Sequence, residues 1–182
     1  MESDKETLHF LLNQCKENNQ KAQFTLYKMY YKAMYNVAFR IVSDAQIAED
    51  CMQESFLKAF TKLDSYSRNV SFGAWLKKIV INESINQLKK EKQFPFEKIE
   101  EYPAITENEN DDANQEYQTL KTNDILNAIQ SLKINYKVII TLHFIEGFDQ
   151  EEIAEILTIS NENCRTQLHR ARESLRKKLQ LK

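Results

Sequence analysis

The chain has 182 residues, with 25 Lys or Arg and 27 Asp or Glu, so its formal net charge is −2. Two Gly and two Pro among many Lys, Glu, Gln, Leu and Ile predict an all-α protein. Three distant cysteines and three scattered histidines argue against a disulfide framework or a metal site and predict a cytoplasmic location. The charged N-terminus lacks a signal core, and the apolar run at 138–145 is too short to cross a bilayer.

The small net charge hides an uneven distribution along the chain. Residues 1–92 carry 14 basic and 11 acidic side chains, and residues 121–182 carry 10 basic and 8 acidic ones. Residues 93–120 carry one basic and eight acidic side chains and contain both prolines. We therefore predict two small helical domains, 1–92 and 120–182, joined by an acidic flexible linker at 93–119.

The first domain shows apolar stripes at helical spacing, which predict four helices. They cover about residues 7–15, 19–42, 43–62 and 72–92, with Ser43 and Gln46 as a capping box for the third. A polar loop at 64–71 precedes the fourth helix. The inward side chains are predicted to be Phe24, Tyr27, Met34, Tyr35 and Ala38; Ile47, Cys51, Ser55, Phe56 and Phe60; and Trp75, Leu76, Ile79, Val80, Ile85 and Leu88.

The second domain is predicted to contain two helices followed by a tightly connected pair. The first two would bury Ile125, Leu126, Ile129 and Leu132, and then Tyr136, Val138, Ile139, Leu142 and Phe144, up to a stop at Gly147. In the pair, Asp149 with Glu152 forms a capping box and Ser160 is a good N-cap. The apolar stripes of the pair are Ile153, Ala154 and Leu157, and Cys164, Leu168, Ala171 and Leu175.

The other face of the last helix is strongly basic. It carries Arg165, Thr166, His169, Arg170, Arg172 and Arg176, and residues 163–182 hold seven basic side chains against one acid, Glu173. This pattern is typical of a helix-turn-helix whose second helix enters a DNA major groove. The alternative, a helical hairpin with a solvated basic face, leaves such one-sided charge unexplained.

Together the two domains resemble an extracytoplasmic-function sigma factor, a small class of bacterial RNA polymerase specificity subunits. The resemblance rests on F-T-L-Y-K-M-Y-Y-K-A-M-Y-N-V-A-F-R-I-V (24–42), A-E-D-C-M-Q-E-S-F-L-K-A-F (48–60), S-F-G-A-W-L-K-K-I-V-I-N-E-S-I-N-Q-L-K-K (71–90) and L-H-R-A-R-E-S-L-R (168–176). It covers nearly the whole chain outside the linker. The chain departs from the family at Thr158, where Gly is usual, and at Asn163-Cys164, where Thr-Val is usual.

The resemblance implies a protein that binds core RNA polymerase, directs it to promoters and helps open the DNA. It implies no catalytic residue, metal or cofactor of the chain's own, and no membrane insertion. The implied partners are the β′ clamp helices of the bacterial core polymerase, promoter DNA and an anti-sigma factor. It also implies a linker that threads toward the polymerase active site and RNA exit, although a solvated tether fits the acidic segment equally well.

The resemblance also assigns residues to three contacts. The third helix would dock on polymerase through Asp50, Gln53 and Glu54. The −10 element would be opened by the loop and fourth helix, with aromatic rings to stack, amides and hydroxyls to read bases and lysines to hold phosphates: Tyr66, Ser67, Arg68, Asn69, Phe72, Lys77, Lys78 and Asn82. The −35 element would be contacted by Asn161, Glu162, Asn163, Arg165, Thr166, His169, Arg170 and Arg172.

Two rival functions are compatible with parts of the pattern. A stand-alone helix-turn-helix regulator would use the first domain for sensing or dimerisation. A helical nucleic-acid-modifying enzyme would need a catalytic constellation that the sequence lacks. Without the family resemblance, the acidic side of the third helix is an ordinary solvated surface, and Trp75 fits a core position as well as a DNA-opening wedge.

Overall fold

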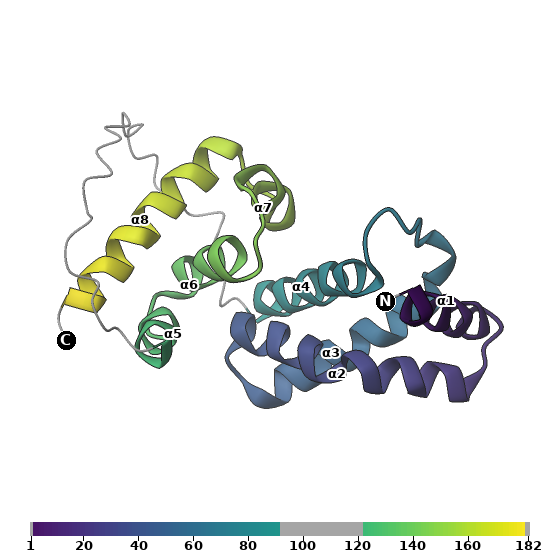
Figure 1. The fold of residues 1–182 in the computed structure, drawn as a ribbon. Coiled ribbons are helices and arrows are strands. Elements are labelled where there is room, and N and C mark those ends of the chain that lie inside the picture. The colour runs from purple at the N-terminus through teal and green to yellow at the C-terminus, as the bar shows by residue number, and fades with distance from the viewer. Residues whose placement is uncertain (1, 92–121, 181–182) are drawn as a thin grey trace. The chain divides into compact units, whose positions relative to one another are not determined.

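The structure is a computed structural model that describes residues 2–91 and 122–180, and its regular elements in these ranges are all helical (Figure 1). The chain divides into two compact units, Met1–Lys90 and Glu91–Lys182. The predicted all-α class is confirmed. The acidic segment predicted at 93–119 lies outside the described residues.

Unit 1 is a helical bundle in which three long helices pack pairwise on one another. Its elements are α1 (Glu2–Lys16), α2 (Gln20–Val42), α3 (Ala45–Thr61), the short 3-10 turn η1 (Leu63–Ser65) and α4 (Phe72–Lys90). The three mutually packed helices are α2, α3 and α4, while α1 lies against α2 and η1. This arrangement leaves one long side of α3 and one of α4 facing solvent.

The core of unit 1 follows the predicted stripes with informative exceptions. Leu26, Ile41 and Leu76 are fully enclosed, and the rings of Tyr27 and Phe56 lie 4.9 Å apart. Phe24 was predicted to face inward but is 57% exposed, with the Lys28 ammonium 4.4 Å from its ring centroid. The side chains of Ile47, Phe60, Trp75 and Ile79 are only partly buried. An apolar stripe in the sequence shows which side of a helix faces the bundle. The packing of α2, α3 and α4 on one another determines which residues of that stripe are fully buried.

The junction between α2 and α3 differs from the predicted capping box. Ser43 adopts a left-handed conformation with φ 60° and ends α2, with its N–H donating to the Phe39 carbonyl. Asp44 instead caps α3, accepting from the Ile47 N–H at 2.9 Å. The prediction that Ser43 caps the third helix is therefore wrong, because a residue that closes one helix in this conformation cannot also take the extended geometry of an N-cap.

Unit 2 is built around one long helix. Its elements are α5 (Thr122–Gln130), α6 (Ile134–Ile140), the π-helical turn η2 (Thr141–Ile145), α7 (Gln150–Leu157) and α8 (Asn161–Gln180). Helices α5, α6 and α7 each pack on α8. The core that they share includes Val138, Ile139, Leu142 and Ile153, none of which is exposed.

The end of the helix formed by α6 and η2 departs from the sequence prediction. Phe144 lies two positions after buried Leu142, which places it on roughly the opposite side of a helix. Phe144, predicted to be buried, is 56% exposed, whereas the predicted stop at Gly147 is confirmed by its φ of 82°. Ile125 and Leu126 on α5 are also exposed, at 36% and 41%, against prediction.

A charged pair links α3 to α4 inside unit 1. The Lys58 ammonium contacts the carboxylate of Glu83 and lies 3.6 Å from that of Glu54. The hydrogen bond to Glu83 raises the pKa of Lys58. The Glu83 side chain is 11% exposed, whereas that of Lys58 is 40% exposed. Glu83 therefore depends on Lys58 for its compensating charge.

Lys58→Met should destabilise unit 1 by about 2 kcal/mol, because it leaves the enclosed Glu83 carboxylate without its charged donor. Urea unfolding followed by the fluorescence of Trp75, the chain's single tryptophan, reports on this unit. The control is Lys58→Met combined with Glu83→Leu, which removes both charges and should recover most of the loss. Equal stability of the single variant and the unsubstituted chain would contradict the dependence of Glu83 on Lys58.

Candidate nucleic-acid interface

Helices α7 and α8 form the predicted helix-turn-helix. The capping box at the start of α7 is confirmed: the Glu152 N–H donates to Asp149 Oδ1 at 2.8 Å, and the Asp149 N–H donates to Glu152 Oε2 at 3.0 Å. The hydroxyl oxygen of Ser160 accepts from the Asn163 N–H at 3.2 Å at the start of α8, as predicted. Ile153, Ala154 and Leu157 are buried, as the stripe on α7 predicts.

The turn between the two helices depends on one left-handed residue. Thr158 has φ 61° and ψ 48°. Its N–H donates to the Glu155 carbonyl at 3.2 Å, and the Ile159 N–H donates to the Ala154 carbonyl at 3.0 Å. These two bonds form a Schellman motif, in which glycine is the favoured left-handed residue. A β-branched residue holds this conformation under strain, so the neighbouring helices enforce the turn.

The inner side of α8 is fixed by burial. Cys164, Gln167, Leu168 and Ala171 are all buried, and Leu175 is partly buried. Burial raises the pKa of the Cys164 thiol to about 11. Cys164 is therefore a packing residue rather than a reactive one. With this side fixed, the rotation of α8 about its axis is fixed, and the opposite side must face solvent.

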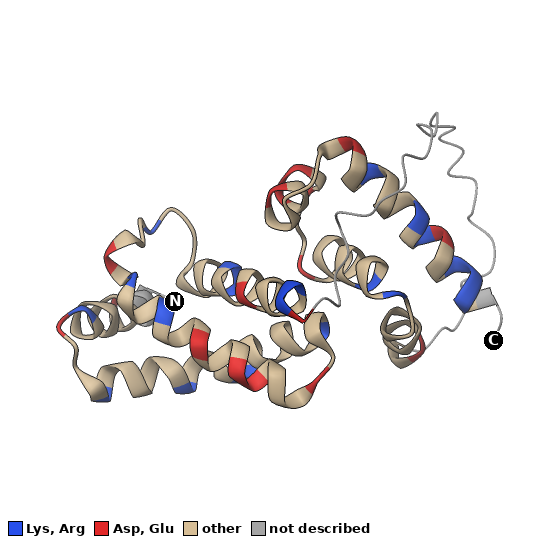
Figure 2. Cartoon of the chain, turned by 180° about the vertical axis from the view of Figure 1, so that it is seen from behind, with Lys and Arg blue, Asp and Glu red and all other residues tan. Residues whose placement is uncertain are grey.

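The outer side of α8 presents the predicted contact residues. Basic positions recur along the helix (Figure 2). The exposed or partly exposed members of the predicted set are Asn161, Glu162, Arg165, Thr166, His169, Arg170 and Arg172. The Thr166 hydroxyl donates to the Glu162 carbonyl at 3.0 Å, and the Arg172 guanidinium lies 5.2 Å from the Phe144 ring centroid. Both contacts restrict side chains on this face.

Asn163 does not present its amide as predicted. Its Oδ1 atom is enclosed and has no hydrogen-bond partner within the described part of the chain. Pairing with adenine needs both the oxygen and the nitrogen of an amide at the base edge. In this conformation the amide oxygen is not available to a base edge, because position 163 faces partly toward the packed side of α8.

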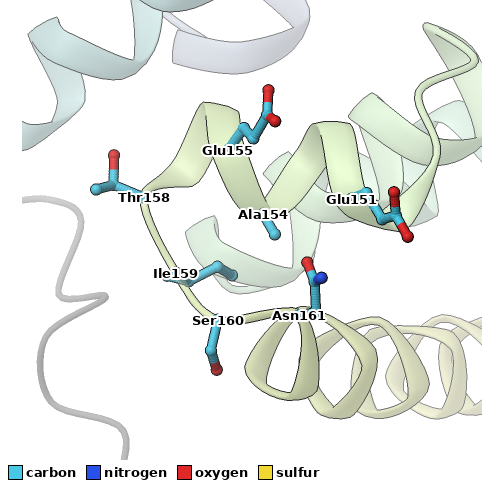
Figure 3. Close-up of a pocket in the computed structure, with 7 residues that line it drawn as sticks. All are labelled: Glu151, Ala154, Glu155, Thr158, Ile159, Ser160 and Asn161. Carbon is cyan, nitrogen blue, oxygen red and sulfur yellow. The ribbon is translucent and has the colours of Figure 1, made fainter.

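An open groove borders the turn and was not predicted from the sequence. It is lined by Glu151, Ala154, Glu155, Thr158, Ile159, Ser160 and Asn161 (Figure 3). In the close-up, Asn161 points from the start of α8 toward Ala154 on α7. The two carboxylates, four residues apart on α7, disfavour phosphate at this edge. This edge of the turn is therefore acidic, whereas the outer side of α8 is basic.

In unit 1, the loop between η1 and α4 is anchored by aromatic packing. The Tyr66 hydroxyl donates to the Val70 carbonyl at 2.7 Å, and the Tyr66 ring lies 5.2 Å from Trp75 and 5.7 Å from Phe72. Phe72 is 1% exposed and also packs against Tyr30. The predicted stacking of a base on Phe72 does not fit this burial. Phe72 instead supports Tyr66, which remains partly exposed.

The polar residues of the loop divide into two groups. Ser67 and Asn69 are exposed. Arg68 is also exposed, but it has φ 64° and its guanidinium is bonded to His9 and Asn13 of α1. No sequence pattern predicts this contact, because the partners are 59 and 55 residues apart. On α4, Lys78 and Asn82 are exposed and Lys77 is partly exposed, so these predicted contacts lie at the surface.

The exposed side of α3 carries an acidic group. Glu49, Asp50, Gln53 and Glu54 are all exposed, and Gln53 Nε2 donates to Glu49 Oε1 at 3.1 Å. Leu57, one turn further along, is 61% exposed. An apolar side chain beside carboxylates and an amide suits a protein partner with basic residues.

Neither a metal centre nor a membrane span is found in the described ranges. No group of three or more His, Cys, Asp or Glu there is arranged to hold a metal ion. No helix among these residues is long and apolar enough to cross a membrane.

Comparison with known proteins identifies both units. A family model described as Sigma-70 region 2 matches residues 26–94, and one described as Sigma-70, region 4 matches residues 122–175. The ECF RNA polymerase sigma factor SigW of Bacillus subtilis is 29% identical over 176 residues, covering 92% of this chain and 94% of the relative. RNA polymerase sigma factor YlaC of the same organism is 30% identical over 155 residues, covering 85% and 90%.

Solved structures share the fold at lower identity. The sigma factor RpoE of Bartonella quintana, solved with the anti-sigma factor NepR, has a TM-score of 0.56 and 23% identity, covering 86% of this chain and 95% of that one. CnrH, solved with the cytosolic domain of CnrY, has a TM-score of 0.53 and 20% identity, covering 94% and 96%.

Thr158→Gly should stabilise unit 2 by about 1 kcal/mol, because glycine avoids the cost of a left-handed conformation, partly offset by its greater freedom when unfolded. Hydrogen exchange of peptides from α7 and α8 measures the change as increased protection. Thr158→Ala is the matched control, since it also shortens the side chain but keeps Cβ and the strain. Equal protection in the two variants would show that the turn is not strained at this residue.

Proposed function

This chain belongs to the extracytoplasmic-function sigma factors of the sigma-70 family, and we propose that its two units recognise the two promoter elements separately. As a sigma factor it binds core RNA polymerase, directs it to specific promoters and helps open the DNA. It is a specificity subunit and not an enzyme. The observation that best supports this function is that a region 2 match and a region 4 match occur in this order in one chain, at 26–94 and 122–175.

The alternative of a stand-alone helix-turn-helix regulator accounts for only half of these observations. It explains α7 and α8 but gives no reason for a region 2 match over residues 26–94. The relatives named as sigma factors are matched over 94% and 90% of their length, so the similarity extends well beyond the helix-turn-helix. Binding of this chain to core polymerase separates the two functions directly.

For the −35 element, we assign base reading to the first turns of α8. Asn161, Glu162, Arg165 and Thr166 lie there, and His169 follows one turn later on the exposed side. Arginine pairs bidentately with guanine and glutamate accepts from cytosine, so Arg165 and Glu162 are the best placed to discriminate bases. Arg170 and Arg172, further along the helix, are assigned to phosphates. Residues 120–182 thus form the −35 domain of the proposal.

For the −10 element, we assign base capture to the loop at 66–71 and the exposed side of α4. Ser67, Asn69 and Asn82 supply donors and acceptors for base edges, and Tyr66 supplies a partly exposed ring on a buried aromatic support. Lys77 and Lys78 are assigned to phosphates. We therefore assign both −10 recognition and polymerase binding to residues 1–92.

For polymerase, we assign docking on the β′ clamp helices to the exposed side of α3, through Asp50, Gln53 and Glu54. The support is the acidic group on this side together with the exposed Leu57. An anti-sigma factor that covered the same side would compete with polymerase. The site of action of such a complex is the cytoplasm, where we place this chain. For the segment at 93–119 we retain two hypotheses: it is a solvated tether, or it enters the polymerase toward the active site and RNA exit.

Reconstitution of the chain with bacterial core polymerase on genomic DNA should yield discrete transcription start sites, whose upstream sequences define both promoter elements.

On these promoters, Arg165→Ala should abolish discrimination at one −35 position, at a cost of about 1–3 kcal/mol. Transcription from promoter variants that differ by one base in the −35 element measures this discrimination. Arg176→Ala is the control and should leave discrimination at every −35 position unchanged, since Arg176 is paired with Glu173 at 2.6 Å and lies far along α8. Uniform weakening by Arg165→Ala would make it a phosphate contact.

Asp50→Arg combined with Glu54→Arg should abolish binding to core polymerase while leaving the helical circular dichroism unchanged, because both side chains are exposed. Affinity is measured with fluorescently labelled chain and purified core. Glu151→Arg combined with Glu155→Arg makes the same charge change at the same spacing on α7 and should leave the affinity for core near its original value. Equal loss in both double variants would indicate a nonspecific effect of charge.

A further inference from the structure

A polar contact joins the N-terminal helix to the loop that precedes α4. Arg68 contacts Nε2 of His9 through one guanidinium nitrogen and donates to Asn13 Oδ1 through the other at 3.3 Å. Lys16 Nζ lies 3.1 Å from Asp64 Oδ1 at the start of the same segment. Residues 9, 13 and 16 follow one face of α1 at helical spacing. We call these contacts the α1–loop clasp.

The chemistry of the clasp defines what each partner supplies. A guanidinium only donates hydrogen bonds, so the His9 ring must accept through Nε2 and carry its proton on Nδ1. Asn13 accepts through its amide oxygen. Arg68 is therefore held at two acceptors on one helix face, a geometry that suits its planar group.

The clasp coincides with a strained point in the loop. Arg68 has φ 64°, a left-handed conformation that is strained for a residue with a side chain. Such a residue persists where its surroundings hold it. The loop is also held across Arg68 by the bond from the Tyr66 hydroxyl to the Val70 carbonyl and by the packing of Tyr66 on Phe72 and Trp75. Exposed Ser67 and Asn69 therefore flank a residue that is fixed from α1.

The clasp is not needed to attach α1 to the bundle. Leu12 and Cys15 are 4% and 1% exposed, and α1 packs along α2. Exposed polar contacts contribute little to stability, whereas fixing a loop in its binding conformation reduces the entropy lost when a ligand binds. The placement of the clasp therefore favours an effect on the loop over an effect on folding.

We propose that His9 and Asn13 of α1 are positioning residues for −10 recognition, which hold Arg68 so that the loop presents Ser67 and Asn69 to an unpaired base. Arg68 thus shapes the loop from within and does not itself contact the base in this conformation. The inference rests on the proposed role of the loop in −10 capture. It gives the N-terminal helix, which precedes the region 2 match at 26–94, a function in promoter opening.

The test uses holoenzyme assembled from the full chain and core polymerase, with a fluorescent single-stranded oligonucleotide that carries the non-template −10 sequence of a mapped promoter. His9→Ala with Asn13→Ala should weaken binding of this oligonucleotide about tenfold, through lost preorganisation, without changing the affinity for core. His9→Gln, which keeps an acceptor, should lose less than His9→Ala. Glu6→Ala, an exposed change on the same helix, is the control and should bind as the unsubstituted chain does.

The outcomes separate this inference from the function on which it rests. Unchanged oligonucleotide binding in the His9 and Asn13 variant, together with weaker binding in Ser67→Ala or Asn69→Ala, overturns the inference and leaves the loop as the −10 reader. Unchanged binding in all of these variants overturns both. Loss of core affinity in parallel with oligonucleotide binding would show that the clasp only holds the unit together, and this also overturns the inference.

Discussion

The burial of one side of α8 is the constraint on which the proposed DNA-reading surface depends. Cys164, Leu168 and Ala171 are enclosed where α5, α6 and α7 meet this helix, and their packing fixes its rotation. Arg165, His169 and Arg172 then face solvent because no other orientation buries the apolar side. The capping box on α7 and the strained turn at Thr158 fix where α8 begins. The basic side of α8 is exposed to solvent because its other side is packed.

In unit 1 as well, α3 and α4 each have one side packed in the core and one side exposed to solvent. Helices α3 and α4 bury Ala48, Phe56, Leu76 and Val80, which leaves an acidic side on α3 and a polar, basic side on α4. The Lys58–Glu83 contact joins these two helices below their exposed sides. One bundle of helices can therefore carry both the proposed polymerase-docking surface and the proposed base-capturing loop at its surface.

The errors in sequence-based assignment share one cause. Phe72 and Asn163 were assigned to DNA by residue type and position, yet the ring of Phe72 is enclosed by aromatic neighbours and the amide oxygen of Asn163 is buried. Phe144 was assigned to the core with the other apolar residues of its helix, but it lies two positions after buried Leu142 and is 56% exposed. The local sequence pattern indicates which contacts a side chain can make and roughly which side of its helix it lies on. Contacts with other elements determine which atoms are accessible.

The sequence alone determined the helical class, the helix-turn-helix and most helix limits, because apolar periodicity and cap residues act over a few positions in the chain. The capping box at Asp149 and Glu152 is such a local signal, and the structure contains it as predicted. Only the tertiary structure decided that Ser43 ends a helix, that Arg68 is held by His9 and Asn13, and that an acidic groove borders the turn. These features depend on the packing of whole helices, and the hydrogen bonds that hold Arg68 join residues more than fifty positions apart.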